Sequence, residues 1–208
     1  MARLTYVYDP LCGWCFGFVP TLRAFAETNP EVEIDVVPGG LVTGDRVGPY
    51  GNMLGYITGA APRMTATTGQ ALGDAFFDMM RQEETPLSTS APPSLAALQM
   101  QKLTDKAGVL RFVHCLLEAH FINGNDLNRA DTYDALCKNL DLPQLDTDAI
   151  VGATDMLPPV AASYKKARSL GVSFFPTSVV YDNEGQNRGA ITGIYDAKEF
   201  QRAFEALT

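Results

Sequence analysis

The 208-residue sequence has only two histidines and one tryptophan, and it is poor in positive charge. Sixteen basic residues stand against twenty-four acidic ones, a net charge of −8. Such an acidic surface repels phosphate backbones and anionic lipid, so we expect neither a nucleic acid nor a membrane as partner. The longest uncharged stretches, 47–62 and 85–101, are interrupted by proline and polar residues. They fall short of the ~20 apolar residues that a membrane-spanning helix needs.

The N-terminal segment lacks the marks of a secretory signal. Residues 1–3 lead directly into 4–8, which has a strand-like composition, with no apolar core and no small-residue cleavage site. We therefore expect a cytoplasmic protein, a compartment in which structural disulfides are rare. A chain of this length can bury enough surface to fold without them.

The chain has four cysteines, of which only Cys12 and Cys15 are close in sequence. In a reducing compartment, a close pair predicts redox or metal chemistry rather than a structural crosslink. Cys115 and Cys137 lie in apolar helical segments, where we expect them to act as small buried hydrophobic side chains. A zinc site formed by all four is disfavoured, because the second pair lacks the spacing of a zinc knuckle. We therefore predict no metal.

The first forty residues have a β-α-β pattern. Residues 4–8 are rich in β-forming side chains and end at the turn signal Asp9-Pro10. Residues 12–28 favour a helix, and 32–37 alternate apolar and acidic residues like a half-buried strand. The helix is long enough to cross between two parallel strands, and such crossovers are right-handed.

The rest of the chain divides into a helical block and a second segment with strands. Residues 44–168 show almost no strand pattern, whereas 178–181 and 189–192 favour an antiparallel strand pair that precedes a last amphipathic helix. The expected order is β-α-β, a helical block, then α-β-β-α. We therefore predict an α/β fold with one domain built from residues 1–43 and 169–208, and a helical insertion domain over 44–168.

The motif Cys12-Gly13-Trp14-Cys15 follows the first strand and opens the first helix. A helix N-terminus offers free N–H groups and partial positive charge, which stabilise a thiolate at Cys12. Because the thiolate is the form that attacks disulfides, we expect Cys12 to be the exposed nucleophile and Cys15, one turn deeper, the resolving thiol. Gly13 and Trp14 lie between them and are candidate substrate-binding residues.

Two segments carry a resemblance to a known family. The segment 8–20, YDPLCGWCFGFVP, resembles the active-site segment of thioredoxin-fold proteins, and Phe175-Pro176-Thr177 resembles their cis-proline segment. Together with the long helical block, they resemble the DsbA family of thiol:disulfide oxidoreductases, in particular its cytoplasmic FrnE-like branch. The similarity in element order covers nearly the whole chain.

The resemblance implies a role for each matching residue. Cys12 would be the nucleophile, Cys15 the resolving cysteine and Pro176 a cis-proline of the catalytic site that keeps metal ions from the thiolates. The main chain of Phe175 would bind an extended substrate peptide, and Thr177 belongs to the same substrate-binding segment. The implied activity is that of a thiol–disulfide oxidoreductase or isomerase acting on protein or small-molecule disulfides. It needs no metal or organic cofactor, and glutathione is a candidate co-substrate.

Two departures from the family leave the direction of electron flow open. The dipeptide between the cysteines is Gly13-Trp14, where thioredoxin has Gly-Pro and DsbA has Pro-His. Phe175 is bulkier than the threonine, valine or isoleucine common before the cis-proline. Residues at these positions tune the reduction potential, and with it the choice between oxidase, reductase and isomerase.

Two other functions share this fold pattern. Kappa-class glutathione transferases and 2-hydroxychromene-2-carboxylate isomerases resemble it in their insertion, but they usually have a serine where Cys12 lies and no second cysteine. A non-enzymatic DsbA-like adaptor of the YjbH type would bind a protein partner without using the pair. The intact pair argues against the first alternative.

Some further residues have two interpretations. Asp9 either shapes the turn before the motif or accepts a proton from Cys15. His114 and His120 lie among apolar residues with no ligand at metal spacing, and we expect structural roles for both. We expect residues 67–70 to cap the start of a helix; the alternative is that they line the active-site cleft from the helical insertion. The sequence leaves the oligomeric state open.

Overall fold

A computed structural model describes all residues, 1–208. The elements are β1 (Arg3–Tyr8), α1 (Gly13–Thr28), β2 (Glu33–Pro38), η1 (Gly44–Arg46), β3 (Gly48–Pro49), η2 (Tyr50–Met53), α2 (Leu54–Thr68), α3 (Asp74–Met80), β4 (Leu87–Ser88), α4 (Ala91–Leu103), α5 (Lys106–Phe121), α6 (Ala130–Leu140), α7 (Thr147–Val151), α8 (Pro158–Ser169), β5 (Thr177–Tyr181), β6 (Asn187–Thr192) and α9 (Ala197–Glu205). The predicted order, β-α-β, a helical block and α-β-β-α, is confirmed.

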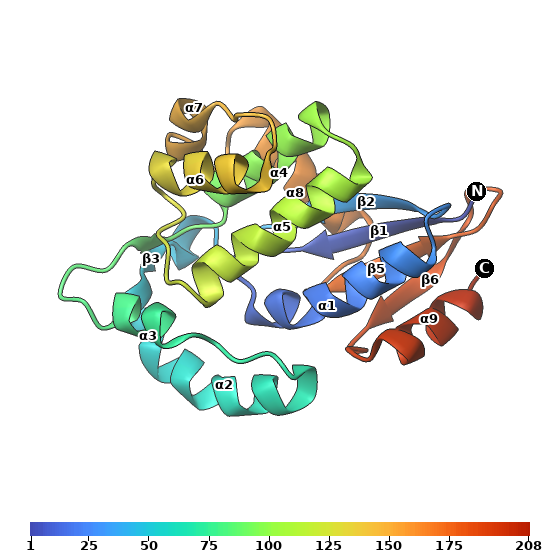
Figure 1. Ribbon diagram of the computed structural model, residues 1–208, viewed down its shortest axis with the longest axis horizontal. Helices are drawn as coiled ribbons and strands as arrows, with labels where there is room; N and C mark the ends of the chain where they lie inside the picture. The colour runs from blue at the N-terminus through green and yellow to red at the C-terminus, as the bar shows by residue number, and fades with distance from the viewer.

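The main sheet has four strands in the order β2-β1-β5-β6 (Figure 1). β1 pairs in parallel with β2 across the α1 crossover, whereas β5 is antiparallel to both β1 and β6. In β1, Tyr6 and Tyr8 face one side and Val7 the other, because side chains alternate along a strand. The central strand is therefore buried on both faces.

Helices cover the two faces of this sheet. Phe25 of α1 packs edge-to-face against Phe200 and Phe204 of α9, with ring centroids 5.3 and 4.8 Å apart. On the opposite face, Ala167 of α8 packs with Val7 and Val37. The arrangement is a three-layer α/β domain, and it sets the N-terminus of α1 at the end of β1 (Figure 1).

The helical block shares its core with the sheet domain. One cluster of 43 buried residues includes side chains from both parts, so the two parts do not have separate cores. Polar contacts add to this packing: Gln101 Nε2 donates to the Val36 carbonyl, and Lys106 Nζ donates to the Val32 carbonyl, both at 2.8 Å. The residue boundaries between the two domains stay a prediction.

The prediction of a helix start at residues 67–70 was wrong. Thr67 and Thr68 form the last turn of α2, and Gly69 closes it with a left-handed φ of 71°. The helix predicted beyond this point begins only at Asp74. α2 escaped prediction because it packs on the protein through few apolar side chains, with only Met64 fully buried.

The remaining cysteines and histidines occupy different surroundings. Cys137 is buried as predicted, but Cys115 is only half-buried at the edge of the core. His120 is fully buried, and its Nδ1 lies 3.1 Å from the carbonyl oxygen of Asn125. His114 lies nearer the surface, 3.0 Å from Glu118.

There is no group of three or more histidine, cysteine or acidic side chains placed to hold a metal ion. No helix has both the length and the apolar composition required to cross a bilayer.

Candidate active site

Cys12 is the N-cap residue of α1. Its carbonyl accepts hydrogen bonds from the main-chain N–H groups of Cys15 and Phe16, at 2.9 and 3.1 Å. The first turn carries no acidic residue, so no side chain within that turn offsets the partial positive charge of the helix end. Cys12 is only 6 % exposed, which corrects the expectation of an exposed nucleophile. It remains the more accessible of the pair, because Cys15 is completely buried.

The surroundings of Cys15 favour its neutral thiol form. Burial raises the pKa of the Cys15 thiol well above its usual range, and the hydrogen bond and charge of Cys12 raise it further. A hydrogen bond from the main chain of Asp9 acts in the opposite direction. Cys15 is therefore held as a neutral thiol beside Cys12, the arrangement expected of a resolving cysteine.

The segment at the start of β5 meets Cys12 from the opposite end of the chain. The Phe175–Pro176 peptide bond is cis, and the Cys12 thiol donates to the Phe175 carbonyl with 3.5 Å between sulfur and oxygen. The antiparallel pairing of Val7 with Thr177 brings the two segments together. The Thr177 hydroxyl is buried and donates to the Phe174 carbonyl at 2.7 Å, so its side chain holds the turn rather than facing outward.

The residues between the cysteines are partly covered by neighbours. A Cβ at Gly13 would lie 3.1 Å from Sδ of Met64, a buried residue of α2. Trp14 packs against Tyr195, with ring centroids 5.7 Å apart. Burial, followed by the charges of Cys12 and Cys15, raises the pKa of Tyr195 to about 12. Tyr195 is thus an aromatic neighbour of the motif that the sequence analysis missed.

Asp9 lies at the end of β1, fully buried, and four donors converge on its carboxylate. Oδ1 accepts from the Leu11 N–H and the Ser90 hydroxyl, both at 2.9 Å, and Oδ2 accepts from the Leu41 N–H at 2.7 Å. The main chain of Gly40 supplies another hydrogen bond. Burial raises the pKa of Asp9 to about 6, although these hydrogen bonds oppose the rise. The expected turn role is present, and the acid also contacts the helical block.

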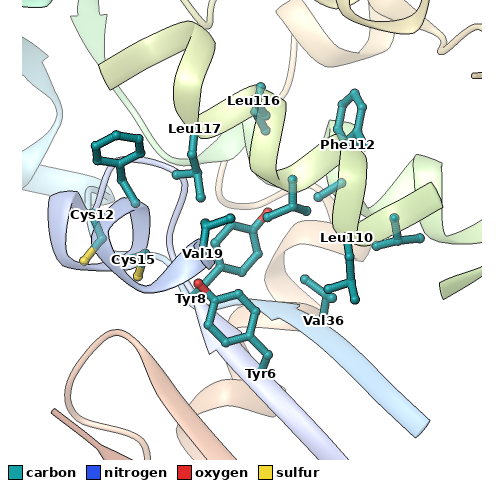
Figure 2. Packing of buried hydrophobic residues seen from close by; sticks show 14 of the residues in the cluster. Tyr6, Tyr8, Cys12, Cys15, Val19, Val36, Leu110, Phe112, Leu116 and Leu117 are labelled. Atoms are coloured by element: carbon teal, nitrogen blue, oxygen red, sulfur yellow. The ribbon is translucent and has the colours of Figure 1, made fainter. Parts of the chain in front are cut away.

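The interior around the motif includes two tyrosines of β1 (Figure 2). Tyr6 and Tyr8 are fully buried and stacked, with ring centroids 5.3 Å apart, and neither hydroxyl has a hydrogen-bond partner. From the sequence, both residues were predicted only to lie in a strand. Their alternation with Val7 was a signal that both rings would share the buried face beside α1.

No protein-family model and no curated protein matches the sequence. Among solved structures, the chain is similar to DsbM, a cytosolic disulfide reductase from Pseudomonas aeruginosa. The identity is 26 % and the TM-score 0.80, covering 98 % of this chain and 97 % of DsbM. A structure of DsbM with GSH gives 25 % identity and a TM-score of 0.78, covering 98 % of each chain.

The chain also shares its fold with a solved structure of lower sequence identity. A 2-hydroxychromene-2-carboxylate isomerase has 11 % identity and a TM-score of 0.62, covering 99 % of this chain and 94 % of the isomerase. At that identity it shows a shared fold alone.

The site has the free cysteine pair at a helix N-terminus and the cis-proline beside it. With its likeness to DsbM, the chain is a DsbA-like thiol:disulfide oxidoreductase of the thioredoxin fold.

Proposed function

We propose that this protein reduces disulfides in the cytoplasm through Cys12 and Cys15, with glutathione as the electron source. The observation that carries the proposal is the hydrogen bond of the Cys12 thiol to the Phe175 carbonyl, which sets the nucleophile beside the main chain that would bind a peptide. DsbM is a cytosolic disulfide reductase, and one of its structures contains GSH. The similarity to DsbM therefore supports electron flow toward the substrate disulfide, glutathione as the electron source and a cytoplasmic location.

The proposed reaction is two successive thiol–disulfide exchanges. The Cys12 thiolate attacks one sulfur of the substrate disulfide, forming a mixed disulfide and releasing the other sulfur as a thiolate. Cys15 then attacks the Cys12 sulfur, forming the Cys12–Cys15 disulfide and releasing the second substrate thiolate. Two electrons pass to the substrate. Two glutathione molecules return the pair to thiols and become oxidised glutathione.

Asp9 is the proposed acceptor of the Cys15 proton. With a pKa of about 6, its carboxylate is ionised at neutral pH and able to take a proton. It lies close enough to Cys15 for its negative charge to raise the pKa of that thiol. A neutral Asp9 would remove this opposing charge once the proton has moved, which favours the Cys15 thiolate needed for the second exchange.

The test compares single cysteine variants in a glutathione-dependent reductase assay with a synthetic peptide disulfide. We expect Cys12→Ser to lose turnover and Cys15→Ser to accumulate a mixed disulfide at Cys12. Cys115→Ser, at a half-buried cysteine of α5, is the matched control and keeps full activity. Full activity in Cys12→Ser would overturn the proposal.

The same variants distinguish the alternatives from the sequence analysis. Glutathione-dependent turnover that survives in Cys15→Ser would favour a kappa-class-like transferase or isomerase. Stable binding of a protein partner that persists in the double variant of Cys12 and Cys15 would favour an adaptor.

The reduction potential tests the direction separately. Equilibration in glutathione buffers measures the potential of the Cys12–Cys15 disulfide, and a reductase should lie near about −270 mV, as thioredoxin does. A potential between about −120 and −180 mV, the range of DsbA and protein disulfide isomerase, would instead indicate an oxidant or an isomerase.

A further inference from the structure

Tyr6 is closely packed in the interior near the cysteine pair. It lies in the middle of β1, has no exposed surface, and its ring packs between two aromatic neighbours. The centroid distances are 5.3 Å to Tyr8, in a stacked arrangement, and 5.6 Å to Phe18 of α1. A ring fixed in this way gives its hydroxyl a defined position.

The Tyr6 hydroxyl has no hydrogen-bond partner, although buried tyrosine hydroxyls usually have one. Figure 2 shows this hydroxyl directed toward Cys15. After burial, the negative charge that Cys15 would carry is the strongest influence on the pKa of the Tyr6 hydroxyl. Tyr8 and Cys12 are the other ionisable groups that face it.

The Tyr6 phenol acts as a donor and not as a base. Burial raises its pKa well above the ordinary value, and nearby negative charge raises it further, so the proton stays on the oxygen. An O–H group in this position is complementary to a thiolate on Cys15. With a neutral thiol it forms only a weak hydrogen bond, because the sulfur of a thiol is a weak acceptor.

We propose that Tyr6 is a catalytic residue whose hydroxyl donates a hydrogen bond to the Cys15 sulfur while that sulfur carries negative charge. This inference rests on the proposed function, since it assigns a donor to the resolving cysteine of that mechanism.

Negative charge is present on Cys15 in both directions of the second exchange. When Cys15 attacks, its electron pair forms the bond to Cys12, and the Cys12–substrate bond breaks with the pair leaving on the substrate sulfur. That sulfur then takes a proton from water. In reverse, a glutathione thiolate attacks Cys12, and Cys15 leaves as a thiolate. The Tyr6 hydroxyl stabilises partial charge in both transition states.

The size of the effect follows from the acidity of Cys15. Loss of one hydrogen bond to a charged group lowers the thiolate population about tenfold. The more basic thiolate is intrinsically more nucleophilic, which offsets about half of that loss on a logarithmic scale. We therefore expect about threefold slower exchange in each direction near neutral pH. The reduction potential stays unchanged, because Cys15 is neutral in the stable reduced state and uncharged in the disulfide.

The test uses Tyr6→Phe, which keeps the ring and removes only the oxygen. Tyr50→Phe is the matched control, since Tyr50 is also buried with an unpartnered hydroxyl but neither cysteine is among the groups that influence it. Oxidised protein is mixed with glutathione, and reduced protein with the peptide disulfide. Both reactions are quenched with an alkylating reagent and followed by intact mass.

Slower exchange in both directions, with an unchanged potential and no effect in the control, would support the inference. Unchanged rates in Tyr6→Phe would overturn it, as would slowing accompanied by a shifted potential, which indicates disturbed packing. As a second measurement, the Cys15 pKa in a Cys12→Ser background, followed by NMR of labelled cysteine, should rise when Tyr6→Phe is added. Activity retained by Cys12→Ser itself would count against the proposed function, independently of Tyr6.

Discussion

The Ser90 hydroxyl donates a 2.9 Å hydrogen bond to the buried carboxylate of Asp9, across 81 positions of sequence. Ser90 is the N-cap residue of α4, in the helical block, whereas Asp9 directly follows β1, an inner strand of the main sheet. The same hydroxyl accepts from the Val42 N–H, also at 2.9 Å. The helical block therefore fixes the acid that lies beside the cysteine pair.

Ser90→Ala removes a donor from the Asp9 carboxylate. A hydrogen bond to a charged group favours the ionised form, so we expect the pKa of Asp9 to rise above about 6. The expected rise is about one pH unit. Carbon-13 NMR of the labelled Asp9 carboxyl measures it. Ser94→Ala, another buried serine of α4 that instead pairs with Tyr164, should leave the Asp9 titration where it is.

Asp9→Asn tests the cost of ionising this buried acid. The folded-state pKa is raised from 3.8 to about 6, so the stabilising contribution is complete below pH 4 and is lost as pH rises through 6. About two pH units correspond to about 3 kcal/mol. In urea titrations at several pH values, the free energy of unfolding of the variant, relative to that of the parent, should therefore increase by about 3 kcal/mol between pH 4 and 7. A difference independent of pH would contradict the raised pKa.

The contribution of His120 to the free energy of unfolding should depend on pH in the opposite direction. Burial lowers its pKa to about 4, so its contribution to stability is complete above pH 6.5 and is lost as pH falls toward 4. Compared with His120→Phe, which suits the neighbouring rings of Tyr50 and Phe76, the parent should lose about 3 kcal/mol of unfolding free energy over this range. Equal acid sensitivity of both proteins would show that His120 is accessible to protons.

Gly39→Ala should disturb the segment that receives the Cys12 thiol. A Cβ at position 39 would overlap the ring of Phe175, whose carbonyl accepts from Cys12. We expect a loss of about 1–3 kcal/mol in unfolding free energy together with slower disulfide exchange. Gly59→Ala, facing open space on α2, is the control and should be neutral or up to about 1 kcal/mol more stable. A fully active, equally stable Gly39→Ala would show that Phe175 moves freely.

Local patterns were sufficient for the strands of the main sheet, the first helix and the redox motif, but not for the short strands β3 and β4 of the helical block. A composition rich in β-forming side chains predicted β1, and the alternation of apolar and acidic residues predicted β2. The position of Cys12 at a helix start followed from the strand before it. α2 could not be predicted in the same way, because it contributes little apolar surface to the core. Thr68 was assigned to a helix start because the left-handed turn at Gly69 depends on backbone geometry that a threonine-rich segment does not reveal.

The sequence by itself determined the chemistry of the protein. Cys12 and Cys15 are three positions apart, and any helix that begins at this motif places them one turn from each other. Tertiary structure decided what surrounds them. Asp9 gained its partner Ser90 only because a distant segment packs at the end of β1. Tyr6 gained its orientation toward Cys15 because α1 packs on the face of the sheet that the Tyr6 ring occupies. Local spacing fixes which sulfurs can meet, whereas burial and long-range contacts set their acidity.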